Sequence, residues 1–199
     1  MLMKRIVAAF TFKKEVYAEV EHDESFTTTA WMIVGVVALL NALGSNAAIL
    51  SSGKGFLSGF AGWIGATIVG ALFAVGGFAL GAFIISWIGK AMFQAEVTFQ
   101  EMVRTLGLAY VWNAIGFIGI VSGIIPFLGC VLAPVIVIAS LMGLVAWLFA
   151  AKEALDLEWG QTAIVVVIGF VATFIISLIG GAIIGLFGFT ASAATGLLG

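Results

Sequence analysis

The chain has 199 residues, of which 63% are hydrophobic and only 9% are charged, and its net charge at pH 7 is −2. Soluble domains carry about 25% charged residues, so this composition excludes an ordinary soluble domain. The slightly acidic balance gives no electrostatic basis for binding nucleic acid. A single cysteine, Cys130, rules out an intramolecular disulfide framework.

The first 29 residues form a polar segment that we place in the cytoplasm. Within it, residues 6–20 have the periodicity of an amphipathic helix, and the apolar stripe contains Ile6, Phe10, Tyr17 and Val20. Lys13 falls in that stripe, where its long stem can reach the lipid headgroups. The pattern predicts a helix lying on the inner membrane surface. The alternative is a short soluble helix that packs on the protein's own cytoplasmic loops.

Five stretches are long and apolar enough to cross a bilayer, because about 20 residues span a hydrocarbon core of about 30 Å. They are residues 30–50, 62–93, 105–125, 127–151 and 162–187. The predicted fold class is all-α: a polytopic integral membrane protein with five transmembrane helices in a domain of residues 30–188, followed by a short apolar tail at 189–199. The second stretch would make a helix of about 48 Å. We expect it to tilt, to break at Gly76-Gly77, or to fold back as two spans.

The orientation follows from the lysines and arginines near the ends of the spans. Seven fall on the side of the N-terminus, and one, Lys54, falls on the other. The seven are Lys4, Arg5, Lys13, Lys14, Lys90, Arg104 and Lys152. A sixth span would leave four on each side and remove the asymmetry. Five spans with a cytoplasmic N-terminus and an outer C-terminus therefore fit the charges better.

Local signals mark both ends of the third span. Thr98 and Glu101 form a Thr-x-x-Glu capping box, so we expect this helix to begin at the cytoplasmic surface and run into the bilayer. Pro126 predicts a tight outer turn between the third and fourth spans, because proline ends one helix and suits the first turn of the next. Pro134 predicts a kink in the fourth span.

The spans hold no charged residue near their centres, which argues against a proton-coupled pump. Their conspicuous polar residues are Asn41, Asn46 and Asn113. One interpretation is that these amides form hydrogen bonds between helices, each contributing about 0.6–2 kcal/mol. The other is a polar groove, with Asn113 opening toward the inner leaflet, which would suit a transporter or channel for a small or lipidic solute.

Charged residues gather in the two short cytoplasmic loops, where we expect any binding site to lie. Together with Asn113, the candidate binding residues are Lys90, Glu96, Glu101, Arg104, Lys152, Glu153 and Asp156, with Glu158 beside them. Ordinary solvated anchoring of helix ends explains such a cluster. The alternative is a docking surface for a soluble protein partner or for lipid headgroups.

Glycines at four-residue spacing suggest close helix packing. The pairs are Gly55/Gly59, Gly77/Gly81, Gly119/Gly123 and Gly181/Gly185. Packing within one molecule is the default interpretation, because a small five-helix bundle must pack tightly. A glycine-rich face through which the protein forms a homo-oligomer is the alternative.

The polar islands between the spans occur in an order that resembles a known family. The islands are FKKEVYAEVE at 12–21, TFQEMVRTLGLAY at 98–110, WLFAAKEALDL at 147–157 and QTA at 161–163. This order resembles the Yip-domain family, named for eukaryotic proteins that interact with Ypt/Rab GTPases, and especially its prokaryotic branch. Relatives often have a proline early in the third span, where this chain has Val111-Trp-Asn113. The resemblance implies a five-span protein with a cytoplasmic N-terminus in a prokaryotic plasma membrane.

The sequence contains no recognisable catalytic motif. It has no zinc-protease, nucleophile-elbow or phosphate-loop motif. His22 lies in an acidic surface run, which suits a solvated segment better than a metal site, and Cys130 has no histidine near it in the sequence. We therefore predict no enzyme, no cofactor and no metal. The sequence favours a non-enzymatic membrane scaffold or adaptor in contact with membrane lipids, which by analogy with the family influences membrane organisation or trafficking-like processes.

Overall fold

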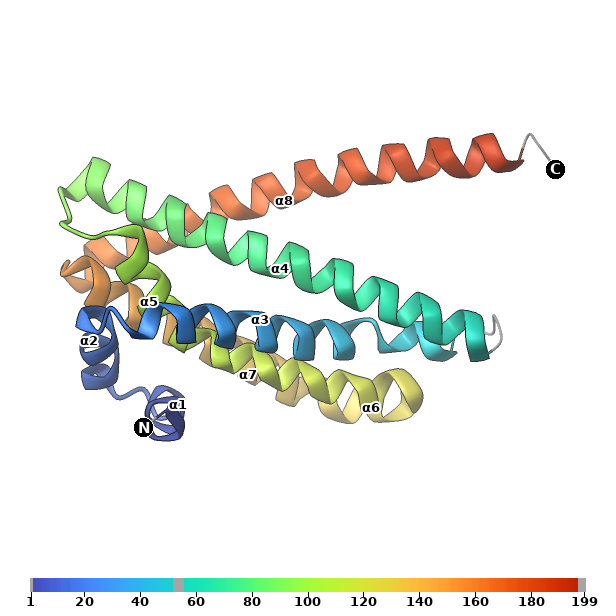
Figure 1. Ribbon diagram of the computed structural model, residues 1–199, viewed down its shortest axis with the longest axis horizontal. Helices are drawn as coiled ribbons and strands as arrows, with labels where there is room; N and C mark the ends of the chain where they lie inside the picture. Colours follow the sequence, from blue (N-terminus) through green and yellow to red (C-terminus); the bar gives the residue numbers. More distant parts are fainter. Residues whose placement is uncertain (1, 52–55, 197–199) are drawn as a thin grey trace.

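The chain is described by a computed structural model, which covers residues 2–51 and 56–196. This part of the chain is helical and contains no strand. Its elements are α1 (Leu2–Phe10), α2 (Lys14–His22), α3 (Phe26–Ser45), the 3₁₀ helix η1 (Ala47–Ser51), α4 (Phe56–Phe93), α5 (Phe99–Ala109), the 3₁₀ helix η2 (Tyr110–Ile118), α6 (Gly119–Ile124), α7 (Pro126–Leu155) and α8 (Trp159–Gly196). Figure 1 shows the long helices running along one common axis, with α1 and α2 gathered at one end.

Five helical stretches are long and apolar enough to cross a membrane. They are Phe26–Ser51, Phe56–Phe93, Phe99–Ile124, Phe127–Leu155 and Trp159–Ile176. The predicted all-α, five-span fold is therefore confirmed. The third span is built from α5, η2 and α6 in succession. α8 continues to Gly196, so most of the predicted tail prolongs the last helix, and residues 197–199 lie outside the described part.

α4 is one continuous helix of 38 residues, about 57 Å long. The predicted break at Gly76-Gly77 is wrong, because both glycines lie inside this helix. In hydrocarbon there is no water to replace a broken backbone hydrogen bond, so the surroundings hold the helix together despite the low helix propensity of glycine. The helix is longer than the bilayer core, and Figure 1 shows it inclined to α3.

The predicted single helix at residues 6–20 is also wrong, because it divides into α1 and α2. The chain turns at Phe12, whose backbone φ is 55°. The Phe12 ring stacks on Trp112 at 5.4 Å between centroids, and this tertiary contact outweighs the continuity of the helix. Figure 1 views α1 nearly end-on, so α1 crosses the bundle axis, and it lies beside the long helices, further from the end of the bundle than α2 does.

The predicted local signals at the ends of the third span are confirmed. The Thr98 hydroxyl accepts a hydrogen bond from the Glu101 N–H at 3.2 Å, and a Glu101 carboxylate oxygen accepts one from the Thr98 N–H at 2.6 Å. Pro126 occupies the first turn of α7, which continues through Pro134. The kink at Pro134 stays a prediction.

The close approach of α3 to the third span depends on glycine. A Cβ atom on Gly119 would lie 2.9 Å from the Gly44 carbonyl oxygen, and one on Gly123 would lie 2.6 Å from the Ala47 carbonyl carbon. The pair Gly119/Gly123 therefore packs within the molecule. In the pair Gly77/Gly81, only Gly81 has neighbours, Trp147 and Thr173. In the pair Gly55/Gly59, Gly55 lies outside the described part, and the pair Gly181/Gly185 lies in a stretch of α8 that is described by its backbone alone.

Candidate functional site at the cytoplasmic end

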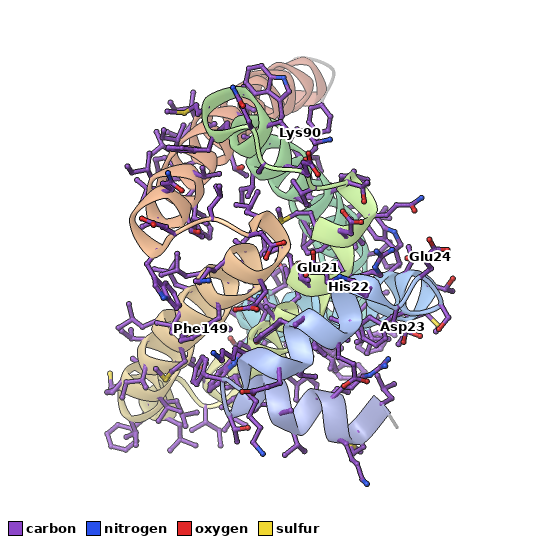
Figure 2. The ribbon with its side chains drawn as sticks, turned by 90° about the vertical axis from the view of Figure 1, so that its left-hand side faces the viewer. Glu21, His22, Asp23, Glu24, Lys90 and Phe149 are labelled. Carbon is purple, nitrogen blue, oxygen red and sulfur yellow. The ribbon has the colours of Figure 1, made fainter. Side chains whose placement is uncertain are left out.

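The end of the bundle that carries α1 and α2 also carries the predicted cytoplasmic charges, and we refer to it as the cytoplasmic end. Figure 2 looks directly onto it. Glu101 and Arg104 come from α5, Lys152 and Glu153 come from the last turn of α7, and Asp156 follows that helix. Exposed Lys90 projects from the end of α4, well away from Glu21. Asn113 lies within the third span and not in this cluster.

Arg104 is the residue that organises this end. Its side chain is only 5% exposed. The Nε atom donates a hydrogen bond to the Glu21 backbone carbonyl at 2.8 Å, Nη2 donates to the same oxygen, and Nη1 donates to the Thr27 hydroxyl at 3.3 Å. The Glu101 carboxylate lies 4.0 Å away. Arg104 therefore fastens α2 and the start of α3 onto α5 and is not a cation free to bind a ligand.

The buried face of α2 completes this attachment. Val16, Tyr17 and Val20 are at most 5% exposed and belong to the main hydrophobic core of the protein. Burial raises the pKa of the Tyr17 phenol, so the hydroxyl stays protonated. It has no hydrogen-bond partner among the described residues. For α2, the alternative prediction of a helix packed on the protein itself is the correct one.

Glu21 is a candidate functional residue that the sequence reasoning missed. Its side chain is 12% exposed. The pKa of Glu21 is raised from its ordinary value of 4.5 to about 7, chiefly by burial and also by the negative charges of Asp156, Glu101 and Glu153, which His22 opposes. A signal did exist, because Glu21 follows Tyr17 by four residues and so shares its helix face. Glu21 therefore joins three of the predicted residues in one acidic cluster.

Arg5 links α1 to α2 and was likewise not among the predicted site residues. Its guanidinium lies 2.6 Å from a Glu19 carboxylate oxygen and 2.9 Å from an Asp23 oxygen, and it covers the Phe26 ring at 5.0 Å. Hydrogen bonds from Ser25 and from Arg5 lower the pKa of Asp23. Arg5 therefore holds the two N-terminal helices at a fixed angle.

Lys152 takes part in an aromatic seam that crosses the same end of the bundle. Its ammonium lies 5.5 Å from the centroid of the Trp159 ring. Trp159 packs edge-on against Phe149 at 5.0 Å, and Phe149 meets Phe12 at 6.1 Å. The seam thus connects the α7–α8 linker to the turn between α1 and α2. An open depression of about 490 Å³, lined by Lys152, Asp156, Leu157, Glu158, Trp159 and Gly160, lies over this linker.

The asparagines of the spans serve mainly to pack helices together. The Asn41 amide donates a hydrogen bond to the Asn113 backbone carbonyl at 3.0 Å, which joins α3 to η2. The Asn113 amide is directed at the Tyr110 carbonyl at 3.4 Å. Asn46 donates to Ala42 within its own segment of chain. The predicted contact between helices is therefore confirmed for Asn41.

The described residues contain no group of three or more histidine, cysteine, aspartate or glutamate side chains arranged to hold a metal ion. The fold and the site together define a class: a five-span helical membrane protein whose cytoplasmic end is covered by its own N-terminal helices. Residues 7–192 match the family model of the Yip1 domain. The chain therefore belongs to the Yip1-domain family, which confirms the resemblance seen in its polar islands. No curated protein and no solved structure matches the chain significantly.

Proposed function

We propose that this protein is a non-enzymatic membrane scaffold or adaptor, which holds a soluble protein at the cytoplasmic end of its bundle. The observation that carries the proposal is the attachment of α2 by Arg104. A surface that binds a partner must keep its shape, and hydrogen bonds to a charged donor contribute about 1.5–3 kcal/mol each. Family membership supports a role at the membrane. We place that role in a prokaryotic plasma membrane, in membrane organisation or a trafficking-like process.

The chemistry of the expected partner follows from the acidic cluster of Glu21, Glu101, Glu153 and Asp156, in which the charges of the other three raise the pKa of Glu21. The cationic Arg104 beside it is buried and occupied by the Glu21 carbonyl. A partner with a basic segment would therefore gain the most from docking here, because complementary charge speeds association and excludes other partners. The depression beside Asp156 offers room for a side chain from such a segment.

The transporter or channel alternative has less support. It depended on a polar groove at Asn113, but this amide is directed at a backbone carbonyl of its own helix. The Asn113 carbonyl in turn accepts the bond from Asn41. Both groups therefore contribute to helix packing.

The test is site-specific photo-crosslinking in native membranes. A photoreactive residue at Leu157, which lines the depression, should form a covalent adduct with one defined soluble protein. The double variant Glu153→Gln, Asp156→Asn should lose that adduct. Asparagine is chosen because Asp156 has a positive φ of 50°, a conformation that asparagine also tolerates. A matched double variant, Glu15→Gln and Glu24→Gln, changes two exposed carboxylates outside the cluster and should keep the adduct.

Two outcomes would contradict the proposal. One is an adduct that survives the Glu153/Asp156 variant as well as it survives the control. The other is the absence of any soluble adduct from Leu157. Deleting the N-terminal segment is not a suitable test, because Tyr17 and Val20 belong to the core and their loss would damage the fold.

Self-association through a glycine-rich face remains part of the proposal. Gly65 and Gly76 on α4 have nothing within 4 Å of a Cβ position, and exposed Leu72 lies between them in the sequence. Their spacing places them on one face of the helix. In a Cys130→Ser background, oxidation of Leu72→Cys in membranes should give a crosslinked dimer, whereas Met92→Cys, also exposed but on the opposite face of α4, should not. Equal crosslinking at both positions would indicate random collision.

A further inference from the structure

An apolar groove of about 390 Å³ lies between α1, α3 and η2. Leu2, Ile6 and Phe10 line it from α1, Met32 and Val36 line it from α3, and Ala114 lines it from η2. Thr29 is the one polar side chain in its lining. The groove therefore offers an almost wholly apolar surface, on which an unpaired polar group would be costly.

The position of α1 identifies the surroundings of this groove. α1 crosses the bundle axis beside the long helices and lies further from the end of the bundle than α2 (Figure 1). Its exposed side chains include Met3 at 74% and Val7 at 56%, next to the groove-lining residues on the helix surface. An exposed apolar face on a helix that lies across the spans is typical of a helix at the membrane interface. For α1, then, the predicted interfacial helix is the better description, and its groove faces the hydrocarbon of the inner leaflet.

A basic depression lies on another side of the same helix. It measures about 460 Å³ and is lined by Met3, Lys4, Val7, Ala8, Thr11 and Lys13. Lys4 and Lys13 are exposed, and neither forms an ion pair within the described part of the chain. Arg5, in contrast, is already occupied by two carboxylates. Two uncommitted ammonium groups thus border the helix that covers the groove.

We propose that α1 seats one anionic phospholipid of the cytoplasmic leaflet. One acyl chain fills the groove against Ile6, Val36 and Ala114, and the phosphate lies against Lys4 and Lys13. Met3 and Val7, which line the basic depression, lie in the path between the two ends of the lipid. An extended peptide segment would suit the groove poorly, because its backbone N–H and C=O groups would find no partners on an apolar wall in hydrocarbon.

The test is the retention of lipid by the intact protein. The protein is reconstituted in nanodiscs that contain equal amounts of phosphatidylglycerol and phosphatidylcholine with identical chains, and the lipids that remain bound are counted by native mass spectrometry. The wild-type protein should retain one phosphatidylglycerol in preference to phosphatidylcholine. Lys4→Gln should lower that preference about fivefold, because one basic residue near an anionic surface contributes about 1 kcal/mol. Lys14→Gln, which changes an exposed lysine outside the basic depression, is the matched control and should behave like the wild type.

A second pair of variants tests the acyl chain. Val36→Trp should fill the groove and abolish retention of either lipid, while Leu39→Trp should leave retention unchanged. Both positions face outward on α3, at 57% and 45% exposure, but only Val36 lines the groove. Equal retention by Val36→Trp and the wild type would overturn the assignment of the groove. Equal binding of the two lipids by the wild type would overturn the role of the lysines. None of these substitutions touches the acidic cluster, so the result is independent of the proposed docking of a protein.

Discussion

Glu21 makes the attachment of α2 dependent on pH. Its pKa is about 7 in the folded protein, against an ordinary value of 4.5. Below the ordinary value the carboxyl is protonated whether or not α2 is attached, so it does not affect the equilibrium. Between the two values the attached state binds the proton more tightly, and attachment therefore weakens as the pH rises. Above about pH 7 the attached state is destabilised by the full amount, roughly 3 kcal/mol, because each unit of pKa difference corresponds to about 1.36 kcal/mol.

The substitution that tests this reasoning is Glu21→Gln, which is nearly isosteric and cannot ionise. Hydrogen exchange of the α2 amides, corrected for the intrinsic exchange rate, measures how often α2 detaches. In the wild type, protection should fall about 30-fold between about pH 5.5 and about pH 8, which corresponds to about 2 kcal/mol. In Glu21→Gln the fall should disappear, and protection at about pH 8 should exceed that of the wild type.

Glu15→Gln serves as the control, because Glu15 is exposed on the same helix and the pH dependence should survive its loss. The reasoning would be refuted if α2 in the wild type were equally protected at both pH values. It would also be refuted if Glu21→Gln kept the pH dependence of the wild type, since the titrating group would then lie elsewhere.

Further predictions follow from single contacts. Arg104→Met should lower the free energy of detaching α2 by about 2 kcal/mol, measured as faster hydrogen exchange in α2. The loss of the charged hydrogen bonds is offset in part because no charge is buried any longer. Gly44→Ala should lower stability in a detergent melt by about 1–3 kcal/mol through overpacking, whereas Gly35→Ala, which meets nothing within 4 Å, should be neutral. Asn41→Leu should cost about 1 kcal/mol in the same melt. Arg5→Gln should increase hydrogen exchange severalfold in α1 and leave α2 protected, because a partly exposed ion pair contributes little.

The features that the sequence predicted correctly depend on neighbours along the chain. Span number follows from hydropathy and length, and the start of α5 follows from Thr98 and Glu101, three residues apart. The turn at Pro126 follows from the geometry of proline itself. None of these requires knowledge of which helices lie side by side. For Asn41 the sequence predicted a hydrogen bond to another helix, because an amide in hydrocarbon needs a partner, but it did not predict which helix.

The features that were missed or wrong depend on residues far apart in the sequence. The chain turns at Phe12, whose ring packs on Trp112, a residue 100 positions away. Arg104 looked like a surface cation, but its partner is a carbonyl on α2, 83 positions away. The break at Gly76-Gly77 was one of three expected ways to fit a stretch longer than the bilayer core, and the chain forms one continuous helix instead. The predicted cluster of charged loop residues did not include Glu21, because only the attachment of α2 brings Glu21 close to Glu101, Glu153 and Asp156.

The two N-terminal helices are held in different ways, and this difference bears on both proposals. α2 is held by protein groups, through Arg104 and a face buried in the core. α1 buries only Ala9 completely, and its attachment relies on the partly buried Ile6 and Phe10, which pack against the core, and on the ion pairs of Arg5 with Glu19 and Asp23. A change of lipid beside α1 would thus act mainly on α1, because the ion pairs of Arg5 couple it only weakly to α2, while a change of pH would act on α2 directly through Glu21.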